Sequence, residues 1–263
     1  MLTYPQINPV AIEIGFIKVH WYGLMYLLGF LCAWLLAKHR MQTNRWWSKE
    51  KLSDLLFYCV LGVMVGGRLG YVLFYHPEYL VTNPLQIFYI WQGGMSFHGG
   101  LLGVIAAMYF FHRKFKIKLL EIFDFVAPVA PIGLGLGRIG NFIGGELYGR
   151  VTNVPWGMVF PHAGNLPRHP SQLYQAALEG VMMFIILWWF SAKPRPNGAV
   201  AGLFLILYSF FRIVVECFRQ PDAHLGFIAY GWLTMGQFLS IAMFIAGVIF
   251  LFFAYNKKVN QLP

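Results

Sequence analysis

The chain alternates between long apolar segments and shorter polar connections. Seven apolar segments stand out, at 18–37, 53–75, 97–112, 120–143, 172–192, 200–218 and 231–254. A helix of roughly 20 apolar residues crosses the hydrocarbon core of a bilayer. The pattern therefore predicts an all-α polytopic membrane protein with seven transmembrane helices. We expect residues 1–263 to form a single integral membrane domain.

Composition supports the membrane class and excludes an ordinary soluble domain. Of the 263 residues, 58% are hydrophobic and only 11% are charged, and the mean hydropathy is +0.58. Soluble domains carry about 25% charged residues. Residues 1–15 contain Glu13 and no Lys or Arg, so we expect the first apolar segment to stay in place and not to be removed as a signal peptide.

The basic residues alternate between the two sides of the predicted bundle. Most of the Lys and Arg residues fall in 38–51, 113–118, 193–195 and the tail after residue 254. The positive-inside rule places these segments in the cytoplasm, with the N-terminus outside and the C-terminus inside. The connections 76–96 and 144–171 then lie outside and form a small cap. The net charge of +10 is mostly a topology signal, and we expect no nucleic-acid partner.

Charged side chains also occur inside the apolar segments, at Arg68, Asp124, Arg138, Arg212 and Glu216. A charge at mid-helix costs roughly 2.5–3.5 kcal/mol on insertion scales. Such residues persist where they pair with one another, line a wet cavity or bind a charged ligand. For Arg68 and Asp124 we expect a structural partnership.

The sixth apolar segment carries a polar stripe. Its members recur at i, i+4, i+8 and i+11 and therefore share one helical face, at Tyr208, Arg212, Glu216 and Arg219. One interpretation is a structural ion pair between Arg212 and Glu216. The other is an anion site in which Glu216 holds the arginine, and the excess of arginine over acid favours it.

The fourth apolar segment combines small residues with polar ones. Glycines recur along one face, at Gly133, Gly137, Gly140 and Gly144. Such a stripe alone is typical of helix packing. Here Arg138 and Asn141 lie side by side at i and i+3, and Glu146 follows where the segment leaves the membrane. This combination favours a functional site.

Two further residues are open to two interpretations each. His98 lies among glycines at the start of the third segment and is either a reactive group or a hydrogen-bonded structural one. Tyr22 lies at the outer edge of the first segment and is either an interfacial residue or a pocket hydroxyl. The histidines and the three cysteines show no metal-ligand spacing, so we expect no metal site.

These residue types suggest chemistry on a lipid phosphate. Two guanidinium groups in a low-dielectric medium bind phosphate oxygens strongly, because the planar fork matches them bidentately. A phosphate held in this way can leave as a stabilised anion. A thiol is a suitable acceptor, because its pKa of about 8.5 lets a neighbouring base deprotonate it. His98 is the first candidate for that base, and Glu146 or a tyrosine stays open.

Several of these motifs also resemble those of a known family. They are the run from Gly137 to Glu146, His98-Gly99-Gly100, the run from Arg168 to Tyr174, and the stretch from Tyr208 to Asp222. Over nearly its whole length the chain resembles bacterial prolipoprotein diacylglyceryl transferases. The resemblance implies transfer of the sn-1,2-diacylglyceryl group of phosphatidylglycerol to the lipobox cysteine of a preprolipoprotein. A thioether forms and glycerol-1-phosphate leaves, as the first step of lipoprotein maturation.

The resemblance further implies an inner-membrane enzyme without a cofactor. By carry-over, Arg138 and Arg212 bind and activate the lipid phosphate, and His98 or a nearby group takes the thiol proton. The remaining substrate-binding positions are Tyr22, Asn141, Glu146, Tyr208, Glu216 and Arg219. Two positions depart from the family pattern, which often has Asn where this chain has Gly144 and an acid where it has Gln175. We assign no role to either.

Two other functions fit part of the pattern. A transporter or channel for an anionic solute would line its path with these arginines. A non-enzymatic scaffold would use the ion pairs only to assemble its helices. Clustering of the polar residues at one depth, rather than along a path, favours the enzyme.

Overall fold

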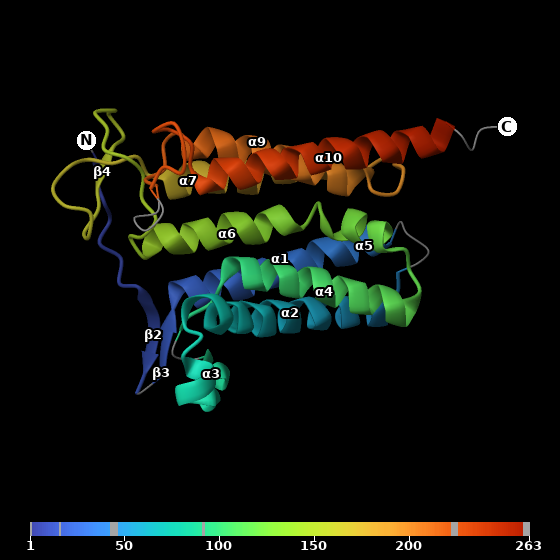
Figure 1. The fold of residues 1–263 in the computed structure, drawn as a ribbon, viewed down its shortest axis with the longest axis horizontal. Coiled ribbons are helices and arrows are strands. Elements are labelled where there is room, and N and C mark those ends of the chain that lie inside the picture. Colours follow the sequence, from blue (N-terminus) through green and yellow to red (C-terminus); the bar gives the residue numbers. More distant parts are fainter. Residues whose placement is uncertain (1, 16, 43–46, 91–92, 222–225, 260–263) are drawn as a thin grey trace. The chain divides into compact units, whose positions relative to one another are not determined.

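The computed structural model describes residues 2–15, 17–42, 47–90, 93–221 and 226–259 (Figure 1). Asp222 of the family-like stretch lies outside these residues. The chain forms two compact units, one from residues 1–36 and 124–263 and the other from residues 37–123. The predicted single membrane domain, with 76–96 and 144–171 as its cap, stays a prediction.

The first unit contains most of the elements. Its strands are β1 (Leu2–Thr3), β2 (Val10–Ile14), β3 (Ile17–His20) and β4 (Met158–Val159). Its helices are α1 (Trp21–Met41) up to residue 36, the end of α5 (Leu119–Val126) from Asp124 onward, α6 (Ala130–Ile143), α7 (Ser171–Gln175), the π-helical segment η3 (Ala176–Met182), α8 (Met183–Phe190), α9 (Ala199–Glu216) and α10 (Met235–Val259). The second unit holds α2 (Lys49–Tyr75), α3 (Tyr79–Thr82), η1 (Pro84–Phe88) and α4 (Phe97–Phe115).

The apolar helices confirm a multi-pass membrane protein. Five helical segments among the described residues are long and apolar enough to cross a membrane: α1, α2, the continuous α7–η3–α8 segment, α9 and the Met235–Asn256 part of α10. The helices α5 and α6 meet at a bend of 49° and make a sixth span if they are counted together. The segment predicted at 97–112 forms α4 but is not among them, because its glycines, His98, Arg113 and Lys114 lower its hydropathy.

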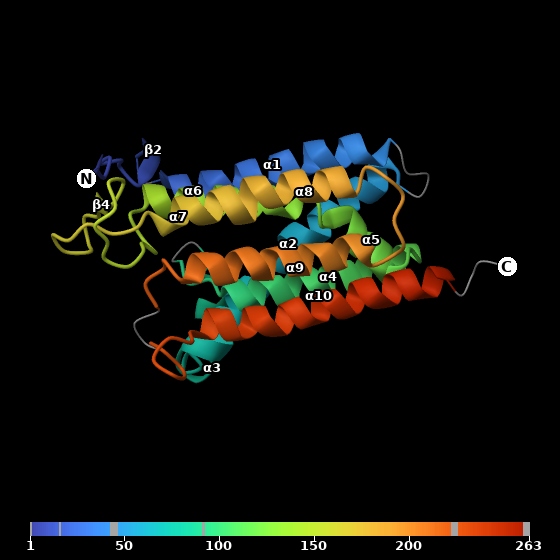
Figure 2. The ribbon, with the colours of Figure 1, turned by 90° about the horizontal axis from the view of Figure 1, so that it is seen from above.

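Glycines allow the helices of the first unit to pack closely. The helices α9 and α10 run antiparallel (Figure 2), and a Cβ added at Gly202 would lie 3.0 Å from the carbonyl oxygen of Gly247. In the same way, a Cβ at Gly135 of α6 would lie 3.0 Å from the Cα of Gly180 in η3. Buried apolar side chains fill the space between α5, α8 and α9, namely Ala127, Met183, Leu187, Val200 and Phe211.

Part of the predicted glycine stripe on α6 serves packing against α1. A Cβ at Gly29 would lie 3.2 Å from the Cα of Gly133, and one at Gly140 would lie 3.1 Å from the Tyr22 ring. A Cβ at Gly137 would meet nothing within 4 Å. The stripe therefore positions Tyr22 beside α6.

Arg68 and Asp124, predicted as structural partners, each make contacts within their own unit. In the second unit the buried Arg68 donates to the carbonyl oxygens of Gln86, Ile87, Gly93 and Gly94. In the first unit Asp124 accepts hydrogen bonds at the start of α9, from the Gly198 amide at 2.6 Å and the Ala201 amide at 2.8 Å. The first amides of a helix have no intrahelical acceptor and carry partial positive charge, which explains why they attract this carboxylate.

The N-terminal residues depart from the all-helical expectation. The strands β2 and β3 form an antiparallel hairpin, and β1 pairs in parallel with β4. Residues 18–20, predicted to open the first transmembrane helix, belong to β3, and α1 begins at Trp21. Alternation of apolar residues at Val10, Ile12 and Ile14 explains the strand, because a period of two suits a hairpin.

We expect Asp124→Ala to destabilise the fold by about 1.5–3 kcal/mol, the usual range for hydrogen bonds to a charged group. The measurement is thermal unfolding of the purified protein in detergent. Asp124→Asn keeps one acceptor oxygen and should lose less. An unfolding temperature of Asp124→Ala equal to that of the wild-type protein would contradict the capping role.

Candidate active site

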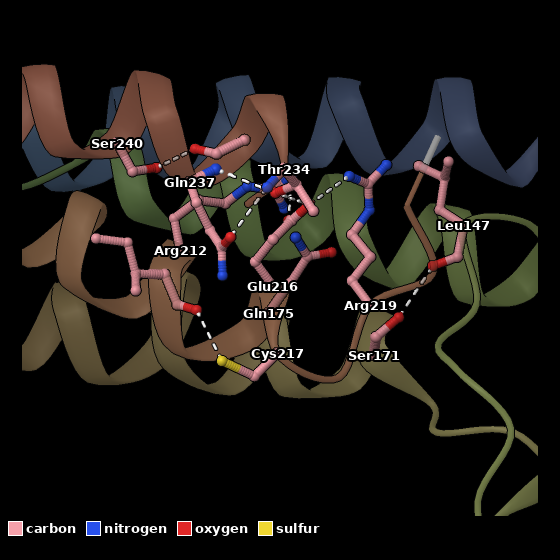
Figure 3. Close-up of polar contacts among 12 residues, drawn as sticks. Leu147, Ser171, Gln175, Arg212, Glu216, Cys217, Arg219, Thr234, Gln237 and Ser240 are labelled. Carbon is pink, nitrogen blue, oxygen red and sulfur yellow. Dashed lines mark hydrogen bonds and ion pairs between the residues drawn. The ribbon is translucent and has the colours of Figure 1, made fainter. Parts of the chain in front are cut away.

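The carboxylate of Glu216 is the centre of a buried polar network at the end of α9 (Figure 3). Arg212 Nη2 lies 3.0 Å from one carboxylate oxygen, and Arg219 Nη1 lies 3.7 Å from the other. Only 2% of the Glu216 side chain is exposed. The predicted sharing of one face by these residues is confirmed, although Arg219 lies just beyond the end of the helix.

The start of α10 supplies a third partner for Glu216. Thr234 donates its hydroxyl at 3.0 Å to Glu216 Oε1, the carboxylate oxygen that lies near Arg219. The same Thr234 hydroxyl accepts from the Gln237 amide, and Gln237 Oε1 accepts from the Thr234 amide. This reciprocal arrangement is a capping box, which fixes the first turn of a helix. A side chain at Gly236 would approach the carboxylate within 3.1 Å, so glycine keeps this side clear.

The last turn of α6 carries a second polar chain. Arg138 Nη1 donates to Asn141 Oδ1 at 3.4 Å, and Asn141 Nδ2 donates to Glu146 Oε1 at 3.0 Å. The predicted proximity of these three residues is therefore confirmed. Among the described residues this amide is the one hydrogen-bond acceptor of Arg138, and no carboxylate lies within 4.0 Å of it. Its guanidinium thus has donors available for an anion.

The loop after α6 is held in place through its backbone. Gln172 Nε2 donates to the carbonyl oxygen of Glu146 at 2.6 Å, and Ser171 donates to that of Leu147 at 3.0 Å. Both side chains are buried at the start of α7. These contacts hold the backbone of Glu146 and Leu147 against the start of α7.

A pocket of about 400 Å³ opens beside Glu146. Its lining comes from the β3–α1 junction and the end of α6, at Pro9, His20, Trp21, Tyr22, Gly23, Gly140, Ile143, Gly144 and Glu146. Tyr22 shares a hydrogen bond of 3.0 Å with the hydroxyl of Tyr26 and interacts electrostatically with Glu146 and Arg138. Tyr22 therefore lines the pocket, as one of its two interpretations expects.

Arginines of the 144–170 loop fix the end of α9. Arg150 Nε donates to the carbonyl oxygen of Arg219 at 3.0 Å, and its Nη2 donates to that of Glu216 at 3.4 Å. Arg168 donates to the carbonyl oxygens of Gly149 and Ala163, each at 3.3 Å. The family-like Arg168 thus organises the loop.

Burial shifts the pKa values of two titratable groups outside the spans, Tyr4 and His169. Burial raises the pKa of Tyr4, whose hydroxyl donates to the carbonyl oxygens of Phe142 and Ile143 at the end of α6. Burial also lowers the pKa of His169, because the protein environment disfavours its charged form. His169 Nδ1 lies 3.1 Å from the Tyr174 hydroxyl, which in turn accepts from Trp156 Nε1 at 2.6 Å. Tyr4 therefore supports the end of α6, and His169 packs the 144–171 loop against Tyr174.

One charged residue of the site was missed from the sequence. Glu179 lies in η3, is fully buried and interacts electrostatically with both Arg138 and Arg212. Tyr208 belongs to the same group, because it interacts with Glu179, Arg138 and Arg212. An acid in the middle of the apolar segment 172–192 was the available signal, by the same reasoning that selected the other buried charges.

His98 belongs to the second unit. It lies in the first turn of α4, where Ser96 caps the helix by accepting from the Gly99 amide at 3.2 Å. Its ring is exposed and meets Phe97 edge to face at 5.6 Å. No group of three or more His, Cys, Asp or Glu side chains among the described residues gathers as a metal site would require.

Comparison with known proteins gives a consistent result. Residues 9–253 match the family described as prolipoprotein diacylglyceryl transferase. A protein of Pseudomonas aeruginosa strain PAO1 is 58% identical over 262 residues, which cover 99% of this chain and 98% of that protein. A protein of Coxiella burnetii strain RSA 331 is 58% identical over 259 residues, covering 98% of this chain and 99% of its own. Both are named phosphatidylglycerol–prolipoprotein diacylglyceryl transferase.

Proposed function

This chain belongs to the prolipoprotein diacylglyceryl transferase family, and we propose that it transfers the sn-1,2-diacylglyceryl group of phosphatidylglycerol to the lipobox cysteine of a preprolipoprotein. The observation that carries the proposal is Arg138. Its guanidinium is held in an apolar span by a neutral amide, with no carboxylate within 4.0 Å among the described residues. A cation kept there at a cost in insertion energy is suited to an anionic ligand.

The neighbouring residues suit a phosphodiester. Arg212 adds a second guanidinium and is held by Glu216 at 3.0 Å. Two planar forks can bind the non-bridging phosphate oxygens, and a low-dielectric setting strengthens the attraction. The pocket lined by Tyr22 and Glu146 gives room for the polar part of a lipid, and Asn141 links its Glu146 to Arg138 by hydrogen bonds.

The transfer is a displacement at carbon. A base takes the proton of the cysteine thiol, and the thiolate sulfur attacks the glyceryl carbon that carries the phosphate. The new carbon–sulfur bond is a thioether. The carbon–oxygen bond breaks with its electron pair on the phosphate oxygen, and glycerol-1-phosphate leaves. Arg138 and Arg212 stabilise the negative charge that develops on this oxygen.

We assign the proton transfer to His98, with Glu146 or a tyrosine as the competing bases. An imidazole titrates near neutral pH and is therefore effective in both taking and releasing a proton. Exposure of His98 at the start of α4 leaves its ring nitrogens accessible. Glu146 is the competitor within the pocket, where Asn141 holds its carboxylate at 3.0 Å.

We place the protein in the bacterial inner membrane with seven spans, of which α4 is the third. The basic segments 38–51, 113–118 and 193–195 then face the cytoplasm together with the C-terminus. The N-terminus and the segments 76–96 and 144–171 face the periplasm and form the cap. Phosphatidylglycerol reaches the site from the surrounding membrane lipids.

The direct test is an assay of the transfer. We expect the purified protein, incubated with phosphatidylglycerol and a lipobox peptide, to add the mass of a diacylglyceryl group to the cysteine. Arg138→Lys and Arg212→Lys should each lower kcat/KM about 10- to 100-fold, because an ammonium cannot replace the bidentate fork.

Arg195→Lys is the matched control for these two variants. Arg195 packs on the ring of Phe190 and donates to the Phe190 carbonyl oxygen at 2.9 Å, so its replacement should leave transfer unchanged. No mass gain with the wild-type protein would refute the enzyme. Flux of an anionic solute into liposomes without a covalent product would support a transporter. Reduced folded yield of both variants, in a protein that shows no transfer, would support the non-enzymatic scaffold.

The role of His98 has its own test. We expect His98→Gln to lower kcat by about 100-fold or more, the usual contribution of a general base. His112→Gln in the same helix is the control, because His112 lies at the other end of α4, where it contacts the carbonyl oxygen of Ile117 and the ring of Tyr109. Near-full turnover of His98→Gln across the pH range, together with loss of turnover in Glu146→Gln, would move the base to Glu146.

A further inference from the structure

Glu179 is a buried acid in η3, a segment that packs against α6, the helix that carries Arg138. Its side chain is 0% exposed, and one carboxylate oxygen accepts from Gln175 Nε2 at 3.5 Å. The other oxygen, Oε2, accepts no hydrogen bond among the described residues. A carboxylate without contacts is expensive to bury, so its retention calls for a charged partner.

Local backbone structure explains how Glu179 reaches this position. It lies in the π-helical segment η3, and such segments insert a residue and rotate the following side chains relative to an α-helix. The neighbouring Gly180 packs against Gly135 so closely that a Cβ there would lie 2.8 Å from the Gly135 Cα. Close contact at this glycine pair brings η3 against α6, the helix that carries Arg138.

The charged neighbours of Glu179 come from two helices. Arg138 on α6 and Arg212 on α9 attract its carboxylate, whereas Glu216 repels it. Tyr208, one turn before Arg212, also interacts with it. Gln175, which donates to Glu179 at 3.5 Å, is itself fully buried. Glu179 is thus an acid that interacts electrostatically with both Arg138 and Arg212.

We infer that Glu179 is a positioning residue whose negative charge orients the guanidinium groups of Arg138 and Arg212 for the phosphate, although among the described residues it forms no ion pair with Arg138 within 4.0 Å. This inference rests on the proposed function. Two guanidiniums repel each other and have long, flexible side chains. A fixed carboxylate behind them offsets the repulsion and reduces their freedom before the lipid binds. Because it acts through the arginines, it touches no reacting atom itself.

The inference predicts a specific kinetic defect. Glu179→Gln keeps the shape and the ability to accept from Gln175 but removes the charge. We expect kcat to fall about 10- to 100-fold while the KM for phosphatidylglycerol changes less than about 3-fold, because misplaced guanidiniums still attract the lipid phosphate but no longer match the leaving oxygen. Glu179→Asp retains the charge and should recover part of kcat.

The control is Glu121→Gln, the same acid-to-amide change at a half-buried position on α5. It should leave kcat and KM unchanged. Thermal unfolding in detergent is measured for every variant, and rates are expressed per folded molecule. A purely structural role for Glu179 would lower the unfolding temperature without moving kcat.

Two results would overturn the inference. One is wild-type kcat per folded molecule in Glu179→Gln, whatever its stability. The other is a kcat in Glu179→Asp no higher than in Glu179→Gln, because charge at this position would then be irrelevant. Absence of transfer by the wild-type protein would instead refute the proposed function, so the two failures are distinguishable.

Discussion

Placing ionised groups inside an apolar helix bundle is the constraint on which this structure depends. Glu216 satisfies it by holding Arg212, Arg219 and Thr234 around a single carboxylate. These contacts join the end of α9, the chain beyond it and the start of α10. Removing one partner of such a buried network leaves an uncompensated charge, typically at a cost of about 3–5 kcal/mol. The network therefore fixes the geometry of this end of the bundle.

Residues outside the Glu216 network support the same end of the bundle. Arg150 binds the carbonyl oxygens that follow α9, and Tyr4 binds those that end α6. At the opposite end of α9, Asp124 caps the first turn. The arginine-bearing helices are thus held at their termini, which keeps flexible side chains on a rigid frame. A rigid frame suits transfer chemistry, because preorganised charges stabilise a leaving anion without rearranging.

Much of the site could be predicted from spacing along single helices. Arg138 and Asn141 at i and i+3, and Arg212 and Glu216 at i and i+4, make the contacts that helical geometry requires. Contacts between distant segments could not be predicted in this way. Thr234 reaches Glu216 only because α10 folds back against α9, and the four backbone carbonyl oxygens that bind Arg68 come from the segment after α2. Glu179 stands out as an acid within an apolar segment, but the π-helical register in which it lies is not revealed by the apolar pattern.

The central claim is that the guanidinium of Arg138 binds the phosphate of phosphatidylglycerol, and a distance measurement tests it most directly. Solid-state NMR of the protein with ¹⁵N-labelled arginine in phosphatidylglycerol membranes detects dipolar coupling between guanidinium nitrogen and lipid phosphorus. A charge-assisted contact predicts a separation of about 4 Å, and the coupling should weaken in Arg138→Lys. Coupling that is absent in the wild-type protein, or unchanged in Arg138→Lys, would contradict the claim.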